Sequence, residues 1–532
     1  MEGWIDHLQL GIQAVFSLAP DYSVLGLALP ITLFMVLGGF IVGIVVGSTP
    51  GLAGPMAMAI SLPILISVFG YNESALLPVF GFLIGIMKGA TVGGAVPAIL
   101  FNTPGTPDAY MTTLDGYPMS QRGESDKALR IAHLSSASGD TFSDIVLILC
   151  APFLAVLVER YLDFPEKTAL LILSMTFIAA VIGKSVGMGL ISIGLGLLAA
   201  FVGTGEDFTP RLTFGTEALA QGFSVASAVL GVLIVGEVFK SLQDIYIDGI
   251  QPQTSDGSPA TAKNKAGKLS ASVVKSISPF IARSAVIGTV IGALPGVGST
   301  LAATLGYSTA KARALKNSKP NSVPFGQGAP EGIAATEAAN SSVSGANLIP
   351  VLSLGIPGNA AAVFLILATD SIGGFNPGPS VFRLTEGSIN SELVIAFGIF
   401  TIMMIANLLN WLIGGRVMRA MGVMTRIPKH YLLPIILLVT LTAVYIQETR
   451  LAAVWFTIGF GMLGYFMRRI GMSPLPFVIA YILGGRLEET ARQAFSATGS
   501  DPWFLFSSYT ATALMLLCIL VVAIAMRRES GR

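Results

Sequence analysis

The sequence predicts an all-α polytopic membrane protein with about 11–12 transmembrane helices and additional broken or re-entrant helices. Composition is the first reason: the 532-residue chain is 53% hydrophobic and 11% charged, whereas soluble domains are about 25% charged. The second reason is that apolar runs of about 20 residues, the length that crosses a bilayer core, recur along the chain. These apolar runs make a lipid bilayer the expected partner. The net charge is only +1, so we expect no nucleic acid as partner.

The chain divides into three parts. Residues 1–240 and 279–532 are apolar, and the stretch 241–278 between them is polar. We interpret these parts as a first transmembrane repeat, a second transmembrane repeat and a cytoplasmic linker that joins them. Uninterrupted apolar runs predict spans near 138–158, 167–182, 184–203, 216–240, 393–414, 430–448, 450–467, 473–485 and 503–526.

Lysine and arginine predict the orientation of the chain. Basic residues beside apolar runs mark the cytoplasmic side of a membrane. The clusters are Arg122/Lys127/Arg130, Lys263/Lys265/Lys268/Lys275, Lys311/Arg313/Lys316/Lys319, Arg416/Arg419/Arg426/Lys429, Arg468/Arg469 and Arg527/Arg528/Arg532. If all of them lie inside, the spans alternate consistently with an N-out, C-in, multi-pass topology.

Two apolar regions, 24–114 and 278–370, are interrupted repeatedly by glycine and proline. Both contain the motif Gly-x3-Gly-x2-Pro-Gly and, further on, a second Pro-Gly pair. The pairs are Pro50-Gly51 and Pro104-Gly105 in the first region, and Pro295-Gly296 and Pro357-Gly358 in the second. Because the charge pattern starts the first region outside and the second inside, we predict two inverted-topology repeats, the plan of many secondary transporters.

The Pro-Gly pairs predict a binding site within the membrane. Proline interrupts a helix, glycine lets the backbone approach a ligand, and the freed N–H groups suit an anion. The alternative is that the pairs are kinks in packed helices. The candidate substrate-binding residues are Ser48, Thr49, Pro50, Gly51, Asn102, Thr103, Pro104, Gly105, Thr106, Pro295, Gly296, Ser299, Thr300, Pro357, Gly358, Asn359 and Lys88.

Four charged or polar residues near these motifs have two interpretations each. Lys88 lies in an apolar run, where a charge is a functional candidate by default; it either offsets substrate charge or is structural, paired with an acid or snorkelling. Glu331, Glu337 and Asn340 lie in a polar helix start; they either supply oxygens to a cation, or they cap the helix or face the cytoplasm. We expect no cofactor but a co-transported cation, sodium or a proton, with a candidate sodium site near Thr49, Asn102, Ser299 and Glu337.

The alternatives to a carrier are a membrane-embedded enzyme and a channel. Such an enzyme needs a nucleophile–base pair or metal ligands, but the sequence has no HExxH motif, and His7, His133 and His430 do not cluster. A channel usually builds its pore from several identical subunits and has no need of inverted halves. We therefore expect a carrier and not an enzyme.

Two long segments resemble the large membrane subunit of the tripartite tricarboxylate transporters. They are GGAVPAILFNTPGTPDAYMTTLDGYPMSQRGESDKAL at 93–129 and FGQGAPEGIAATEAANSSVSGANLIPVLSLGIPG at 325–358. The first is similar to the family's NxPG break followed by a DGYPMA loop, and we expect a tight loop at 115–118. The second is similar to the family's FGxGxxEGxxxxEAANNA and LGIPG segment. The chain departs from this pattern at Ser341-Ser342 and at Asp108, where Asn-Ala and a small residue are expected.

This resemblance implies a permease subunit in the bacterial inner (cytoplasmic) membrane that imports small di- or tricarboxylates by cation symport, usually with sodium. It also implies two partners: a small membrane subunit and a periplasmic solute-binding protein that delivers the carboxylate. The extra acid at Asp108 disfavours plain citrate as the substrate. At the level of the fold, the analogy is with two-hairpin elevator carriers of anions.

Overall fold

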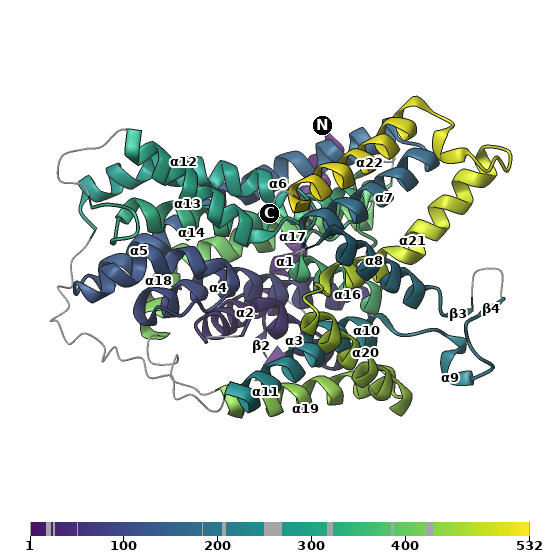
Figure 1. The fold of residues 1–532 in the computed structure, drawn as a ribbon, viewed down its shortest axis with the longest axis horizontal. Helices are drawn as coiled ribbons and strands as arrows, with labels where there is room; N and C mark the ends of the chain where they lie inside the picture. Colours follow the sequence, from purple (N-terminus) through teal and green to yellow (C-terminus); the bar gives the residue numbers. More distant parts are fainter. Residues whose placement is uncertain are drawn as a thin grey trace.

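The computed structural model describes residues 2–17, 23–24, 27–49, 52–182, 185–204, 209–248, 269–316, 323–384, 388–421 and 429–530. These residues form helices joined by turns and by two short antiparallel hairpins (Figure 1). The hairpins pair β1 (Ser23–Val24) with β2 (Leu27–Ala28) and β3 (Gly203–Thr204) with β4 (Pro210–Arg211). The predicted all-α class is confirmed.

Eight helical segments among the described residues are long and apolar enough to cross a membrane. They are Glu73–Phe101, Ser125–Tyr161, Phe164–Val181, Val225–Ile247, Ala271–Gly292, Ser391–Ala420, Leu451–Arg469 and Tyr509–Arg527. Five shorter apolar helices accompany them: Ile31–Gly47, Gly54–Phe69, Val186–Ala200, Ala360–Ile372 and Leu433–Glu448. The chain is therefore a polytopic membrane protein, while the expected number of about 11–12 crossings stays a prediction.

The uninterrupted apolar runs coincide with helices. These are α6 (Ser125–Tyr161), α7 (Phe164–Val181), α8 (Val186–Ala200), α10 (Val225–Leu230) with the π-helical turn η3 (Gly231–Val235) and α11 (Gly236–Asp248), α17 (Ser391–Leu409) with η5 (Asn410–Gly414) and α18 (Gly415–Ala420), α19 (Lys429–Glu448), α20 (Leu451–Arg469), α21 (Leu475–Ala497) and α22 (Tyr509–Ser530). Figure 1 shows α22 beside α7, at the top of the view.

Several predicted boundaries are wrong, among them the starts of the first and the last predicted span. The last span begins at Tyr509 and not at residue 503, because the Ser508 hydroxyl accepts a hydrogen bond from the Ala511 N–H and caps the helix there. Helix α6 begins at Ser125, well before the predicted residue 138. The residues before 138 include half-exposed charged side chains and the buried polar Ser135 and Ser136, so the apolar run omits them.

The first broken region forms helix–break–helix–helix–break–helix. Its members are α2 (Ile31–Gly47), α3 (Gly54–Phe69), the turn η1 (Glu73–Ala75), α4 (Leu76–Phe101), the turn η2 (Pro107–Ala109) and α5 (Tyr110–Gln121). Glycines let α2 and α4 pack backbone against backbone. A Cβ added to Gly43 would lie 2.5 Å from the carbonyl oxygen of Ile86, and one added to Gly89 would lie 2.2 Å from that of Phe40.

The second broken region repeats this order. Its members are α12 (Ala271–Gly292), α13 (Gly298–Lys316), α14 (Pro330–Ala346) continued by α15 (Leu348–Leu354), and α16 (Ala360–Ile372). Gly288 and Gly292 of α12 face the backbone of α14, as the glycines of α2 face α4. The two regions thus share one order of elements, and their inverted relation stays a prediction.

The remaining elements cover or join these two regions. They are α1 (Glu2–Phe16), which packs on α17, together with α9 (Glu217–Ala220), η4 (Pro379–Phe382) and η7 (Phe504–Phe506). Of the predicted linker, 241–248 and 271–278 belong to α11 and α12, and 249–268 lie outside the described residues. Figure 1 shows α12, α13 and α14 lying side by side, with α14 against α5 and α6 at the join between the two regions.

Candidate functional site

Each described break is followed by the start of a helix. Helix α13 begins two residues after Gly296, α16 begins two residues after Gly358, and η2 and α5 follow Gly105. The first N–H groups of a helix have no partner within it, and they carry partial positive charge. The predicted source of anion-binding groups is therefore present at these three breaks. Pro50 and Gly51 lie outside the described residues, although α3 begins shortly after them at Gly54.

In the first region, the chain around the second Pro-Gly pair folds back on α2 and α4. The Gly105 N–H donates to the Gly94 carbonyl oxygen at 3.2 Å, and a Cβ on Gly105 would lie 2.1 Å from the carbonyl oxygen of Gly47. Only glycine fits this approach. The Ser48 hydroxyl donates to the carbonyl oxygen of Gly93 at 3.3 Å. The end of α2 and the second break of this region therefore touch.

In the second region, the two Pro-Gly pairs touch directly. The Gly296 N–H donates to the Gly358 carbonyl oxygen at 2.8 Å, and Gly296 has a φ of +84°, a left-handed conformation that favours glycine. The Asn359 side chain accepts a hydrogen bond from the Ala362 N–H and caps α16. Thus the second region brings its two breaks together, and in the first region the end of α2 lies against the second break.

A hydrogen bond joins the breaks of the two regions. The Thr300 hydroxyl in the first turn of α13 donates to the Asp108 carboxylate in η2 at 2.6 Å. Asp108, the acid that departs from the family pattern, is thereby held at the boundary between the halves. Thr49 donates locally to the carbonyl oxygen of Val45, and Thr103 to that of Phe101. The hydroxyl of the candidate Thr106 is buried and has no described hydrogen-bond partner.

A polar stripe on α14 runs through the protein interior between the two regions. We call Glu337, Asn340, Ser341, Ser344 and Asn347 the α14 polar stripe. Their spacing of three, four, seven and ten residues from the first member puts them on one face of the helix. All five side chains are buried. Glu337 and Asn340 therefore lie in the middle of a buried helix, and the interpretation of these two as helix caps is wrong.

The contacts of the α14 polar stripe reach two other helices and one break. Glu337 accepts hydrogen bonds from the hydroxyls of Thr112 in α5 and Ser136 in α6. The Asn347 amide oxygen lies 3.2 Å from where a Cβ on Gly358 would be. Among the described residues, the structure gives the side-chain amides of Asn340 and Asn347 no hydrogen-bond partner. Buried amides usually have one, so both are candidates to bind a ligand, and Asn347 lies at the break.

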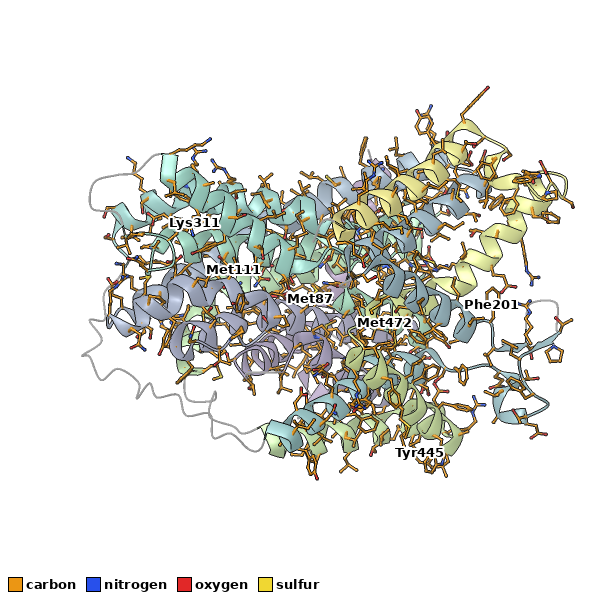
Figure 2. The ribbon with its side chains drawn as sticks, viewed as in Figure 1. Met87, Met111, Phe201, Lys311, Tyr445 and Met472 are labelled. Carbon is orange, nitrogen blue, oxygen red and sulfur yellow. The ribbon has the colours of Figure 1, made fainter. Side chains whose placement is uncertain are left out.

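Lys88 lies in a buried cluster with two aspartates of α6. Its ammonium group is 3.2 Å from the Asp140 carboxylate and 2.7 Å from that of Asp144, and all three side chains are 0% exposed. Ser344 of the α14 polar stripe donates to Asp140, and Asn407 of α17 donates to Asp144 at 2.7 Å. This geometry favours the structural pair over a direct role of Lys88 with substrate. Figure 2 shows Met87, the neighbour of Lys88, near the centre of the molecule.

The expected tight loop at 115–118 is wrong. These residues lie inside helix α5, where the buried Asp115 carboxylate accepts three backbone N–H groups, from Gly326, Gly328 and Ala329, each at 2.8 Å. The Arg122 guanidinium donates to the carbonyl oxygens of Gln327 and Gly328. The 93–129 segment thus fixes the start of α14, which lies in the 325–358 segment, a role that a loop interpretation misses.

The structure does not join the predicted sodium ligands to one another. The described hydrogen bonds link none of Thr49, Asn102, Ser299 and Glu337 to another member of that set. Within the described residues there is also no group of three or more His, Cys, Asp or Glu side chains arranged to hold a metal ion. The sodium site stays a prediction, and the unpartnered oxygens of the α14 polar stripe are additional candidates that the sequence interpretation only partly included.

Comparison with known proteins identifies a family. Residues 33–479 match the model of the "Tripartite tricarboxylate transporter TctA family". The chain is 30% identical over 501 residues, 93% of each protein, to the Agrobacterium vitis "Uncharacterized 52.8 kDa protein in TAR-I ttuC' 3'region". It is 32% identical over 239 residues to the "Uncharacterized protein in TAR-II ttuC' 3'region" of the same organism, covering 45% of this chain and 93% of that protein. No solved structure matches the chain.

Proposed function

Because this chain belongs to the tripartite tricarboxylate transporter TctA family, a family of transporters and not of enzymes, we propose that it is the large membrane subunit of a secondary transporter that imports small di- or tricarboxylates. The observation that carries this proposal is the pair of buried, unpartnered amides at Asn340 and Asn347, the second of which faces the break at Gly358. Amide N–H groups and helix starts both donate hydrogen bonds to carboxylate oxygens.

Import of such an anion requires coupling to cations. Moving one charge through 100 mV is worth about 2.3 kcal/mol, so a trivalent anion entering a negative-inside cell faces roughly 7 kcal/mol. Three co-transported cations cancel this electrical cost, and a fourth lets the potential drive entry. We propose sodium as the cation, with the proton as the alternative.

The buried charges of the described interior are consistent with cation coupling. Asp140, Asp144 and Glu337 are all buried, and Lys88 is the buried cation near them. Uncompensated charge in a low-dielectric interior is unfavourable. An excess of carboxylates over ammonium groups therefore favours the entry of cations or protons together with an anionic substrate.

The family also suggests the assembly and its location. The TctA family belongs to three-part transporters, and we propose that this chain works with a small membrane subunit and a periplasmic solute-binding protein. We propose the bacterial inner membrane as its site, with the N-terminus outside and the C-terminus inside.

The test is uptake into proteoliposomes that contain this chain with its small membrane subunit. Labelled succinate, malate and citrate are supplied with and without the binding protein, and sodium and proton gradients are imposed separately. We expect uptake that follows the sodium gradient and requires the binding protein. Uptake that ignores both gradients and the membrane potential contradicts secondary coupling, and full-rate uptake without the binding protein contradicts the three-part assembly.

A variant of the α14 polar stripe tests the site. Asn347→Leu keeps the number and branching of the side-chain heavy atoms and removes an unpaired buried amide, so folding should be preserved. We expect at least a tenfold loss of uptake at a subsaturating substrate concentration. The matched control is Asn410→Leu, which removes another buried amide without a described partner, in η5 and away from the breaks. Equal uptake by the two variants would place the anion elsewhere. Gly296→Val is a poorer test, because its Cβ would meet Ile178 at 2.6 Å.

A further inference from the structure

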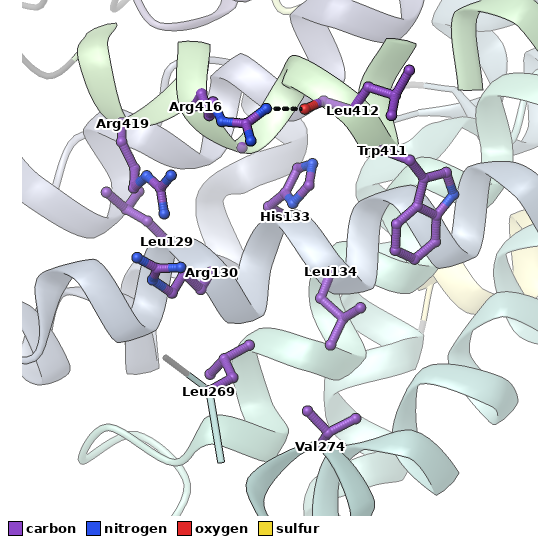
Figure 3. A pocket seen from close by; sticks show the side chains of 11 residues that line it. Leu129, Arg130, His133, Leu134, Leu269, Val274, Trp411, Leu412, Arg416 and Arg419 are labelled. Carbon is purple, nitrogen blue, oxygen red and sulfur yellow. Dashed lines mark hydrogen bonds between the residues drawn. The ribbon is translucent and has the colours of Figure 1, made fainter. Parts of the chain in front are cut away.

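A cavity of about 420 Å³ opens where three helices end, apart from the Pro-Gly breaks. Its walls come from the first turns of α6, from the start of α12, and from the segment η5–α18 that follows α17. Figure 3 shows Arg130 and Arg419 toward one end, Trp411 at the other and His133 between them. No residue of the breaks or of the α14 polar stripe lines this cavity, so it is not part of the carboxylate site proposed above.

The cavity carries an excess of positive charge. Three arginines line it: Arg130, Arg416 and Arg419. One carboxylate, that of Asp126, serves two of them, at 2.8 Å from Arg130 and 3.8 Å from Arg419. The Arg416 guanidinium donates to the backbone oxygen of Leu412 at 2.7 Å (Figure 3), and among the described residues it forms no ion pair. Three guanidinium groups around one cavity favour an anion with several oxygens, such as a phosphate.

The rim of the cavity is apolar and faces outward. Along α17 and η5, the side chains of Met404, Leu408 and Leu412 recur every fourth residue and are 37%, 56% and 56% exposed. Trp411 is 44% exposed, and its indole N–H donates to the Thr141 hydroxyl at 3.1 Å, which fixes the ring at the edge of the cavity. In a polytopic membrane protein such a stripe faces hydrocarbon chains, and tryptophan is enriched at the boundary with the headgroups.

We propose that this cavity binds an anionic phospholipid. The phosphate lies among Arg130, Arg416 and Arg419, the headgroup edge contacts Trp411, and an acyl chain follows the stripe of Met404, Leu408 and Leu412. A water-soluble anion would use the arginines but not the apolar stripe that begins at the rim. Basic cavities between the cytoplasmic ends of transmembrane helices are the usual place for acidic headgroups, and the basic clusters of the sequence put all three of these helix ends on the inner side.

The test uses the fluorescence of Trp411 in vesicles of phosphatidylcholine. Acyl-brominated phosphatidylglycerol or acyl-brominated phosphatidylcholine is added as quencher, and the signal of Trp411 is the difference between the wild type and Trp411→Phe. We expect phosphatidylglycerol to quench this signal at lower mole fraction than phosphatidylcholine. Each arginine near a membrane surface contributes about fivefold, so Arg416→Gln with Arg419→Gln should reduce the preference about 25-fold.

A matched double variant and a soluble competitor complete the test. Arg313→Gln with Lys316→Gln removes two exposed basic residues at the end of α13 and should leave the preference unchanged. Equal quenching by the two lipids in the wild type overturns the proposal without any variant. Displacement of the brominated phosphatidylglycerol by millimolar glycerol 3-phosphate or citrate also overturns it, in favour of a site for soluble anions. None of these measurements depends on transport.

Discussion

Lys88 illustrates how a single buried charge depends on its partners. Two carboxylates face its ammonium group, and all three side chains are 0% exposed. Lys88→Met would leave Asp140 and Asp144 buried without a cation, and breaking a buried ion pair in this way costs about 3–5 kcal/mol. We expect a clear drop in the apparent Tm of the purified protein in detergent.

Two further variants separate charge from packing at this cluster. A triple variant, Lys88→Met with Asp140→Asn and Asp144→Asn, removes all three charges and should recover much of the lost stability. Lys240→Met, which breaks a largely exposed ion pair with Asp244, should change stability by less than about 1 kcal/mol. If the triple variant is no more stable than Lys88→Met, packing of the lysine stem and not charge pairing is what matters.

The role of a single residue can be predicted from the sequence when its effect on the chain is local. Proline and glycine have local effects, so the breaks at Gly105, Gly296 and Gly358 could be located without a structure. The partners of Lys88 could not, because Asp140 and Asp144 are about 50 residues away and nothing in their spacing marks them as its neighbours. The signal for Asn347 was present, since Asn340 and Asn347 are two turns apart on one helix face, but only burial distinguishes such a stripe from a solvated face.

Helices α2 and α4 pack at a distance that glycine alone allows. A Cβ on Gly89 would lie 2.2 Å from the carbonyl oxygen of Phe40, whereas one on Gly194 in α8 meets no atom within 4 Å. Gly89→Ala must therefore separate the two helices, and we expect a large loss of folded protein in fluorescence-detected size-exclusion chromatography. Gly194→Ala should be neutral or stabilising by about 0.5–1 kcal/mol, because alanine favours the helix. Wild-type behaviour of Gly89→Ala would mean that the α2–α4 contact is looser than described.

Helices could be predicted from the sequence where an apolar run and a helix have the same limits. This holds for α7, α8, α19 and α20, whose bounds agree with the runs within a few residues. It fails for α6 and α5, because their polar residues, such as Ser136 and Asp115, point into protein and not into water. Hydropathy measures the cost of leaving water, so it does not recognise a polar helix that finds its partners inside the molecule.

The orientation of the whole chain is open to a direct test. In a background with Cys150 and Cys518 replaced by alanine, Thr216→Cys and Ala312→Cys place single thiols at exposed positions that the basic clusters put outside and inside. A membrane-impermeant maleimide should label Thr216→Cys in intact spheroplasts, and Ala312→Cys only after permeabilisation. The reverse pattern would invert the topology and move the arginine-lined cavity to the outer face.

The sequence predicts the order of elements in the molecule but not how the halves meet. Two Pro-Gly pairs per half, in one order, predict that α2 to α5 correspond to α12 to α16. The contacts that join the halves, such as Thr300 with Asp108 and Thr112 with Glu337, connect residues about 200 apart. A single sequence does not indicate such pairings, because each partner alone is an ordinary polar residue on a helix.

The Asp115 contact has a consequence for how the protein is made. Its carboxylate is buried and receives its three N–H donors from a segment that begins 211 residues later in the chain. Chains are synthesised from the N-terminus at about 5–20 residues per second, so α5 is complete for roughly 10–40 seconds before its partner leaves the ribosome. During that time Asp115 has to stay hydrated or protected, so the first half cannot reach its final structure in the membrane before the beginning of the second half, up to Ala329, has been translated.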